Sequence, residues 1–182
     1  NLLKIPHVVM LLLSFGIKLS YHMLPRFTTD KIDFLFGHRY NILMESHMKE
    51  ELSMEKSIIS TPKAPDAIGP YSQGWIAGSM VYTSGQVPVD PASGEIPSGI
   101  TAQAERSCQN VAAVLEAGGA ALQDVIKTTC FLADMEDFAA FNEVYARYFT
   151  SKPARSCVAV RELPKGALCE IEAIAIRTDG VS

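Results

Sequence analysis

The stretch V-I-K-T-T-C-F-L-A, residues 125–133, decides the fold, because it predicts a strand that leads directly into a helix. Its β-branched and aromatic residues are typical of strands. Asp134 then offers an N-cap for the helix. Aromatic side chains follow at helical spacing and form the expected core stripe of that helix: Phe138, Phe141, Tyr145 and Tyr148.

A second strand is predicted by S-K-P-A-R-S-C-V-A-V, residues 151–160, which alternates along its length. Pro153 cannot donate a hydrogen bond to a sheet, and it biases the residue before it toward extended geometry. The strand is therefore expected to begin just after Pro153. Together the two stretches predict a strand–helix–strand unit with a right-handed crossover.

Similar signals organise the chain on both sides of this unit. Residues 73–86 predict a hairpin with a two-residue turn, and residues 168–177 predict the last strand. A helix that ends at Gly118 and Gly119 is predicted by apolar residues on one helical face: Ala104, Cys108, Val111 and Leu115. We expect the order strand, strand, helix, strand, helix, strand, strand. The fold class is then α/β (α+β), a two-layer sandwich with a mixed sheet and both helices on one face.

The last strand carries apolar residues on both faces. Leu168, Ile174 and Ile176 alternate with Cys169, Ala173 and Ala175. Two helices on one face leave the second face of the sheet uncovered. Covering that face by self-association is the economical solution, so we expect a homo-oligomer.

The chain divides near residue 54. From Met54 onward, 10 Lys and Arg residues oppose 15 Asp and Glu residues, a formal charge of −5. All histidines precede that point: His7, His22, His38 and His47.

The first part of the chain shows no sustained helical or strand periodicity. The apolar run at residues 8–13 is too short to span a bilayer, which takes roughly twenty residues. A secretory signal fits loosely, because Lys4 is its single early charge and no clear cleavage site follows. We expect residues 1–53 to be an extension ahead of a natural start at Met54, and residues 1–57 together to be disordered or non-native. Residues 58–182 then form the domain, in a cytoplasmic protein.

Four cysteines lie in the second part, each within an apolar run: Cys108, Cys130, Cys157 and Cys169. No two of them form a C-x-x-C pair, and no histidine lies near, which argues against a zinc site. We interpret them as buried, reduced thiols in a cytosolic protein.

Arg155 stands near the start of its predicted strand, between the small residues Ala154 and Ser156. A guanidinium there is a fixed positive fork that can bind a carboxylate or a phosphate through two hydrogen bonds. The alternative is a surface arginine paired with an Asp or Glu, because many ion pairs are only structural. The stretch at 151–160 alone leaves both interpretations open.

Five motifs occur in order along the second part of the chain. They are I-G-P-Y-S-Q-G at 68–74, T-S-G-Q-V-P at 83–88, F-N-E-V-Y at 141–145, P-A-R-S-C-V at 153–158 and L-P-K-G-A-L-C-E-I-E-A at 163–173. Together they closely resemble the RidA family, also called YjgF or L-PSP-type proteins, over residues 58–177. The resemblance implies a chorismate-mutase-like fold, a homotrimer with clefts between neighbouring subunits, and no cofactor. The activity it implies is a hydrolase acting on C=N bonds, which converts reactive 2-imino acids released by pyridoxal-phosphate enzymes to 2-oxo acids and ammonia.

The resemblance also assigns the main catalytic groups. Arg155 grips the substrate carboxylate, which fixes the reacting carbon, and a peptide N–H near Cys157 adds a second donor. Glu170 holds a water against the imine carbon and accepts its proton. Glu172 shares a strand face with Glu170, so periodicity alone leaves open which of the two meets the cleft, and the resemblance selects Glu170. We interpret Glu172 as a structural partner for a lysine or arginine.

Further site residues follow from the same motifs. Tyr71 supplies a hydroxyl to the imine or the incipient amine, with a core tyrosine as its alternative. Ser84 and Asn142 are candidate wall contacts, and for Asn142 a packing or capping role is an equal alternative. Gly85 permits close approach of the backbone to the ligand. Cys157 is a quiet thiol beside the site, because no histidine in the domain can activate it.

Two other functions compete with the imine hydrolase. Relatives have been labelled translation inhibitors or single-strand ribonucleases, but a charge of −5 disfavours binding to nucleic acid. The domain also lacks histidine, the usual proton carrier in metal-free RNA cleavage. The third candidate is a non-catalytic module that only holds a small carboxylate. Changing Glu170 to Gln separates it from the enzyme, since binding should survive and turnover should not.

Overall fold

The computed structural model describes residues 56–177. The predicted extension lies outside the described residues, apart from Lys56 and Ser57, which begin the first strand. Neither helix in this part of the chain has the length and hydrophobicity of a membrane span.

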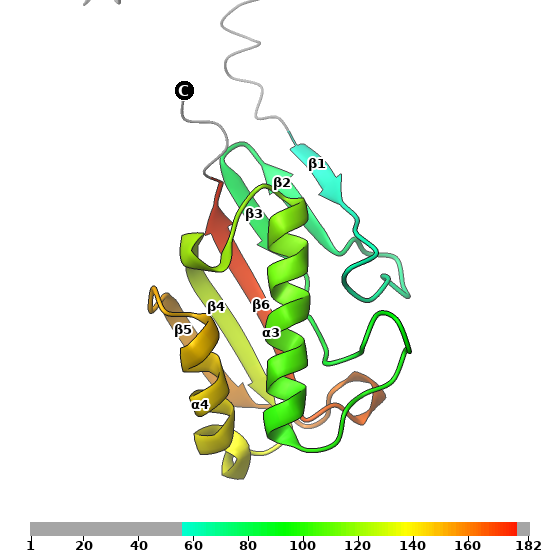
Figure 1. Ribbon diagram of the computed structural model, residues 1–182, viewed down its shortest axis with the longest axis vertical. Helices are drawn as coiled ribbons and strands as arrows, with labels where there is room; N and C mark the ends of the chain where they lie inside the picture. Colours follow the sequence, from blue (N-terminus) through cyan, green and yellow to red (C-terminus); the bar gives the residue numbers. More distant parts are fainter. Residues whose placement is uncertain (1–55, 178–182) are drawn as a thin grey trace, which may run out of the picture. The chain divides into compact units, whose positions relative to one another are not determined.

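Six strands form one mixed sheet, and two helices cover one of its faces (Figure 1). The helices are α3 (Ile100–Ala117) and α4 (Phe138–Tyr148). The strands are β1 (Lys56–Ile59), β2 (Gly74–Ala77), β3 (Met80–Thr83), β4 (Val125–Leu132), β5 (Ala154–Ala159) and β6 (Cys169–Ile176). Their order across the sheet is β1-β2-β3-β6-β4-β5, and β4 with β5 is the parallel pair. The prediction of a two-layer sandwich with a mixed sheet and both helices on one face is confirmed.

The unit β4–α4–β5 forms where the opening stretch predicted it. A turn of 3₁₀ helix at Met135–Asp137 precedes α4, and the Asp134 carboxylate accepts a hydrogen bond from the Glu136 amide. The predicted N-cap residue therefore caps this turn rather than α4 itself. The helix returns the chain so that β5 pairs parallel to β4, with Arg155 opposite Thr128.

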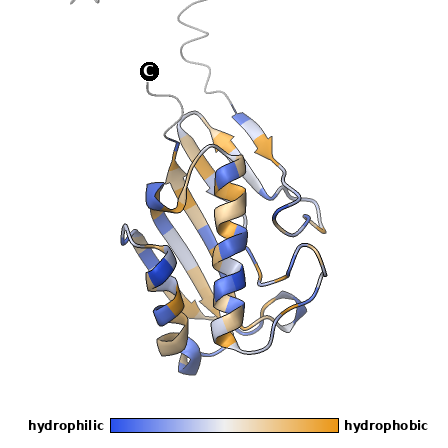
Figure 2. Ribbon diagram, viewed as in Figure 1, coloured by the Kyte–Doolittle hydropathy of each residue, from blue (hydrophilic) through white to orange (hydrophobic). Residues whose placement is uncertain are grey.

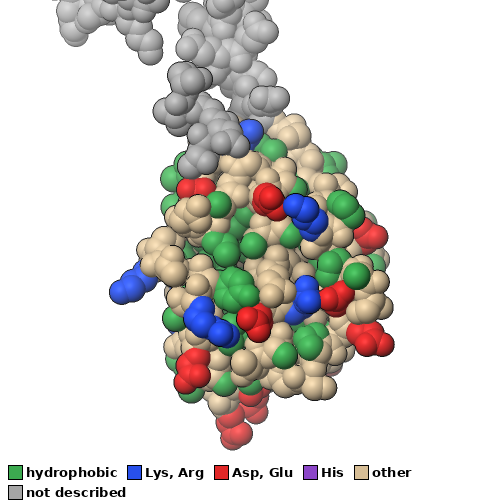
Figure 3. Space-filling model, in the orientation of Figure 1, with side chains coloured by type: hydrophobic (Ala, Val, Ile, Leu, Met, Phe, Trp, Pro, Cys, Tyr) green, Lys and Arg blue, Asp and Glu red, His purple; other side chains and the backbone are tan. Residues whose placement is uncertain are grey.

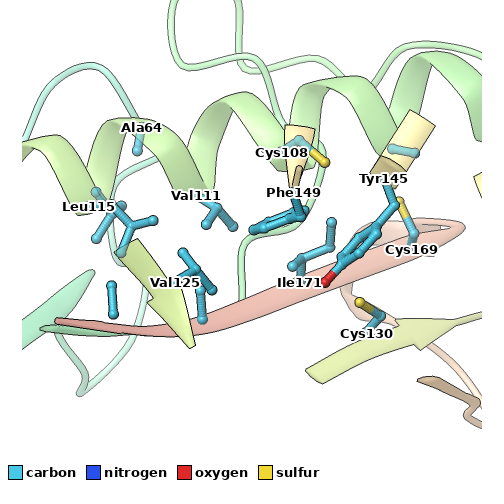
Figure 4. Packing of buried hydrophobic residues seen from close by; sticks show 14 of the residues in the cluster. Ala64, Cys108, Val111, Leu115, Val125, Cys130, Tyr145, Phe149, Cys169 and Ile171 are labelled. Atoms are coloured by element: carbon cyan, nitrogen blue, oxygen red, sulfur yellow. The ribbon is translucent and has the colours of Figure 1, made fainter. Parts of the chain in front are cut away.

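The core lies between α3, α4 and the sheet. All four residues of the stripe predicted for α3 are fully buried, and Figure 4 shows three of them, Cys108, Val111 and Leu115, close to the sheet. The helix ends at the predicted glycine pair, where Gly119 adopts a φ of 78° that suits glycine. Hydrophilic and hydrophobic residues alternate along both helices in Figure 2, as expected for helices with one face on a sheet.

Strand β1 is the element that the sequence did not predict. It has four residues, and three of them are exposed, so the stretch is too short and too polar to show alternation. It pairs with β2 from Lys56 opposite Ala77 to Ile59 opposite Gly74. Ile59 is its single buried residue and joins the core.

An apolar row crosses the sheet face that the helices leave uncovered. Ile58 is opposite Trp75, Trp75 is opposite Tyr82, and Tyr82 is opposite Ile174. Ile58, Trp75 and Tyr82 are 59%, 41% and 42% exposed. Because side chains alternate along strands, their buried neighbours face the helices and the row faces away from them. The prediction that apolar residues occupy both faces of the last strand is confirmed, and the uncovered face is suited to association.

Candidate active site

Arg155 lies on the edge strand β5, and its side chain points to the face covered by α4. Its Nη1 atom donates a 2.7 Å hydrogen bond to Oδ1 of Asn142. The guanidinium carbon lies 4.6 Å from the ring centre of Tyr145 and 5.7 Å from that of Phe138. All three of these neighbours are uncharged.

Arg155 has no acidic partner among residues 56–177. The ion pairs in that part of the chain are elsewhere: Lys63 with Glu116, Arg106 with Asp90 and Arg147 with Glu105. The structural ion pair that the sequence left open is therefore not found within the described domain. Because no carboxylate in the part that the structure describes neutralises this half-buried guanidinium, its positive charge is available to bind an external anion.

The backbone beside Arg155 offers further donors. The Val160 amide donates to the Leu132 carbonyl, so this amide points toward β4. Because amide directions alternate along a strand, the N–H groups of Arg155 and Cys157 point to the other side. That side is the open edge of the sheet, since β5 has β4 as its only neighbour among the described strands. The described sheet therefore does not use the N–H of Cys157. This N–H remains available as a second donor to a carboxylate.

The thiol of Cys157 is partly buried next to the guanidinium. Burial raises the pKa of this thiol, although the charge of Arg155 acts in the opposite direction. A protonated thiol is a poor nucleophile. This result supports the interpretation of Cys157 as a quiet thiol.

Glu170 lies on β6 with its carboxylate half-buried. Burial, and secondly the negative charge of Glu172, raises the pKa of Glu170 above its ordinary value. Gly85 lies directly against this carboxylate, and a Cβ atom at position 85 would collide with it. The Gln86 amide donates a 2.8 Å hydrogen bond to the Ile171 carbonyl, which holds the Gly85 backbone beside β6.

Glu172 occupies the same sheet face as Glu170, as the alternation predicted. Its expected lysine or arginine partner is not found within residues 56–177. Lys127, on the neighbouring strand, donates instead to Ser156 Oγ and to the Thr128 carbonyl. Glu172 therefore contributes its charge to the surroundings of Glu170 rather than to an internal ion pair.

Tyr71 and Gly85 line one hollow in the surface, together with Gln86 and Lys165. Tyr71 is 53% exposed, which excludes the alternative of a core tyrosine within this chain. Ser84 donates a 2.6 Å hydrogen bond from its hydroxyl to the Ser72 carbonyl. This bond ties the turn before Gly85 to the loop that carries Tyr71.

The seven predicted site residues fall into two groups. Arg155 is opposite Thr128, and Thr128 is opposite Ala173, so these three face the helices. Glu170 is opposite Phe131 and lies between the buried residues of β6, so it faces the uncovered side. Asn142 and Cys157 belong with Arg155, whereas Tyr71, Ser84 and Gly85 belong with Glu170. The seven residues of one chain therefore form two candidate half-sites.

The family described as Endoribonuclease L-PSP matches residues 61–177. The chain belongs to this family. Both candidate half-sites of this L-PSP protein lie within the matched residues, and the resemblance noted from the motifs is confirmed.

Several relatives in the L-PSP family are about half identical to this chain. A 2-iminobutanoate/2-iminopropanoate deaminase of Escherichia coli is 51% identical over 123 residues, which cover 65% of this chain and 96% of the relative. The crystal structure of E. coli TdcF with bound serine has a TM-score of 0.65 and 52% identity, and covers 67% of this chain and 99% of that one. The structure of the E. coli YjgF gene product has a TM-score of 0.65 and 50% identity, and covers 66% and 98%.

Sequence reasoning missed several neighbours of the candidate site residues in this L-PSP protein. Phe138 and Tyr145 were predicted to be core residues; Tyr145 is buried and Phe138 half-buried, yet both also face Arg155. Their helical spacing predicted burial, but it could not predict that they would contact Arg155. Lys165 and Gln86 also line the hollow; both lie in the motifs quoted above, but neither was given a role in the site. In the described domain, His, Cys, Asp and Glu side chains form no group of three that could hold a metal ion.

Proposed function

We propose that this protein hydrolyses 2-imino acids to 2-oxo acids and ammonia. The observation that carries the proposal is the guanidinium of Arg155, which is half-buried and has only uncharged neighbours in the described domain. The name of the E. coli deaminase, 51% identical to this chain, supports the same reaction. A 2-imino acid carries a carboxylate next to its C=N bond, so one anion-binding group can place the reacting carbon.

Binding begins at the carboxylate. Arg155 donates two parallel hydrogen bonds to it, and the N–H of Cys157 at the open edge of β5 adds a third. Asn142 holds one side of the guanidinium and so limits its rotation. Fixing the carboxylate fixes C2 of the substrate in one position, which lowers the entropic part of the barrier.

Hydrolysis then needs a base and a proton donor. Glu170 accepts a proton from water while the water oxygen bonds to C2, and the imine nitrogen takes up a proton from solvent to become an amine. The carbinolamine that results loses ammonia as its C–N bond breaks, and its hydroxyl group releases a proton to solvent as the C=O bond forms. The raised pKa of Glu170 suits this group to return the proton to the leaving nitrogen. The hydroxyl of Tyr71 donates a hydrogen bond to that nitrogen, while Ser84 and Gly85 form the wall of the pocket.

The complete site requires more than one chain. Arg155 and Glu170 face opposite sides of one sheet, so a substrate held by Arg155 of one subunit meets Glu170 of another. A homotrimer with sites between subunits meets this requirement. It also covers the apolar row at Ile58, Trp75, Tyr82 and Ile174, which the helices leave open. The unpaired thiols of the four cysteines support a reducing compartment, so a cytoplasmic location is part of this proposal.

The alternatives are less well supported. Acidic and basic side chains are interspersed on the helix-covered face in Figure 3, and the charge from Met54 onward is negative, so nucleic acid is disfavoured as a partner. A module that only binds carboxylates would share Arg155 but would not need the raised pKa of Glu170. The Glu170→Gln protein distinguishes the two, since an enzyme loses turnover and keeps binding.

The test couples a deaminase that releases 2-iminobutanoate to this protein and follows formation of ammonia and 2-oxobutanoate. We expect the wild-type protein to accelerate both, and Arg155→Ala to lower kcat/KM by at least about a hundredfold, as for lost charge-assisted hydrogen bonds. Arg147→Ala is the matched control, because its ion pair with Glu105 is long and exposed. Wild-type protein that leaves the rate of imine hydrolysis unchanged would refute the proposal.

A further inference from the structure

Helix α4 presents one stripe of three side chains to Arg155. Phe138, Asn142 and Tyr145 occupy positions i, i+4 and i+7, which share a helical face. Asn142 accepts a hydrogen bond from the guanidinium, and the ring centres of Phe138 and Tyr145 lie within 6 Å of the guanidinium carbon. The nearer ring, that of Tyr145, is at a distance where a cation is attracted to an aromatic face.

We propose that Tyr145 is a positioning residue that orients the Arg155 guanidinium for the substrate carboxylate. The inference takes one point from the proposed function, namely that Arg155 binds the carboxylate of a 2-imino or 2-oxo acid. Tyr145 itself does not touch the substrate. It acts through Arg155.

Tyr145 is held from two sides, which makes its ring a fixed surface. Its hydroxyl and that of Thr128 form a buried 2.7 Å hydrogen bond, and Figure 4 shows the hydroxyl directed toward the sheet. Its ring stacks on Phe149 with centroids 4.4 Å apart. Thr128 is directly opposite Arg155 in the β4–β5 register, so the same strand pair anchors the ring and carries the guanidinium.

The neutral character of the ring matters for binding. An acidic residue at the position of Tyr145 would form an ion pair with Arg155 and compete with the substrate carboxylate. A ring face attracts the guanidinium without using its N–H groups, and Asn142 accepts from Nη1 alone. The remaining N–H groups are left to form the bidentate contact.

The test compares Tyr145→Leu with Phe141→Leu. Phe141 lies on the same helix and is fully buried, with its ring centre 6.0 Å from that of Tyr145, so its replacement costs similar packing beside Tyr145 without removing a neighbour of Arg155. We expect Tyr145→Leu to weaken binding of 2-oxobutanoate, measured by calorimetry, by about tenfold. The KM for 2-iminobutanoate should rise equally, with kcat within about threefold of wild type. Phe141→Leu should leave both binding constants within about twofold. Tyr145→Phe keeps the ring but loses its hydrogen bond to Thr128, so it should weaken binding only about two- to threefold.

A spectroscopic measurement needs no ligand. In arginine-labelled protein, the ring of Tyr145 should shift the Nε–H signal of Arg155 upfield, and Tyr145→Leu should abolish this shift. If Tyr145→Leu does not fold, Thr128→Val serves instead, because it removes the hydroxyl that anchors the ring and keeps the ring itself. We expect that variant to weaken binding about two- to threefold.

Equal effects of Tyr145→Leu and Phe141→Leu on binding, or an Nε–H signal that does not move, would overturn the positioning role. Unchanged binding in Thr128→Val would count against it in the same way. These outcomes are distinct from failure of the proposed reaction. A wild-type protein that binds 2-oxobutanoate but does not accelerate imine hydrolysis would refute the enzyme, while the binding differences among the variants would still decide the role of Tyr145.

Discussion

Arg155 and Glu170 face opposite sides of one sheet. The register places Arg155 level with Thr128 and Ala173 on the helix-covered face, whereas Glu170 is level with Phe131 on the uncovered face. The sheet lies between the two side chains, so they point away from each other within one chain. The proposed reaction therefore depends on contact between subunits.

Mixed oligomers offer a direct test of this dependence. Arg155→Ala and Glu170→Gln should each be nearly inactive alone. Refolded together in equal amounts, they should recover about a quarter of the wild-type activity, because a quarter of randomly formed sites pair an intact Arg155 with an intact Glu170. The measurement is ammonia release per chain. A mixture with no more activity than the sum of the two variants would place both groups in a single chain's site.

The raised pKa of Glu170 should appear in the pH dependence of the reaction. A base must be ionised, so kcat/KM should fall as the pH drops through a value above 4.5, the ordinary pKa of this group. Part of the shift comes from the negative charge of Glu172. Glu172→Gln should therefore lower the pKa of Glu170 and move the acidic limb of the profile to lower pH. Glu162→Gln, at an exposed position, is the control and should leave the limb in place.

The same shift has a consequence for stability. A carboxyl whose pKa is raised by folding favours the folded state below its unfolded pKa and loses that contribution as the pH rises through the folded value. At pH 7 the ionised Glu170 is therefore unfavourable, and Glu170→Gln should raise the Tm by a few degrees. Below about pH 4 the two proteins should converge, since both side chains are then neutral. Thermal melts at the two pH values check this, and a lower Tm for the variant at pH 7 would contradict it.

The order of helices and later strands could be predicted because apolar periodicity is a local property. The stripe of α3 and the alternation of β6 each reflect burial of one side of one element. Strand β1 was not predicted because its four mostly exposed residues show no alternation of apolar and polar side chains. Its pairing with β2 is what defines it as a strand. Periodicity also placed Tyr145 in the core correctly, but could not indicate that its ring would face Arg155.

The division of the candidate site residues into two half-sites could not be predicted, again because it depends on strand pairing. Motifs identified Arg155 and Glu170 separately, yet the faces they occupy depend on the register of β4 with both β5 and β6. The expected cation partner of Glu172 was inferred from charge alone. Within residues 56–177, Lys127 is engaged by Ser156 and a carbonyl, and no lysine or arginine there pairs with Glu172.

Cys157 should contribute its backbone and not its sulfur. The raised pKa keeps the thiol protonated, and its peptide N–H points to the open edge of β5. Cys157→Ser and Cys157→Ala should both retain kcat within about threefold, because neither removes the N–H. A loss of a hundredfold or more in both variants, with unchanged melting temperature, would assign a chemical role to the thiol.

Gly85 should be required for full activity because the carboxylate of Glu170 lies directly against it. A methyl group at this position would meet the carboxylate of Glu170, and that carboxylate is the end of a flexible side chain that can move aside. Gly85→Ala should therefore fold normally but displace the base by an ångström or more, which lowers kcat by about a hundredfold. Glu170→Gln supplies the control, since Gly85→Ala added to it should cause little further loss if the glycine acts only through the carboxylate. Two losses that multiply in the double variant would show instead that Gly85 contributes independently, through its own contact with the substrate.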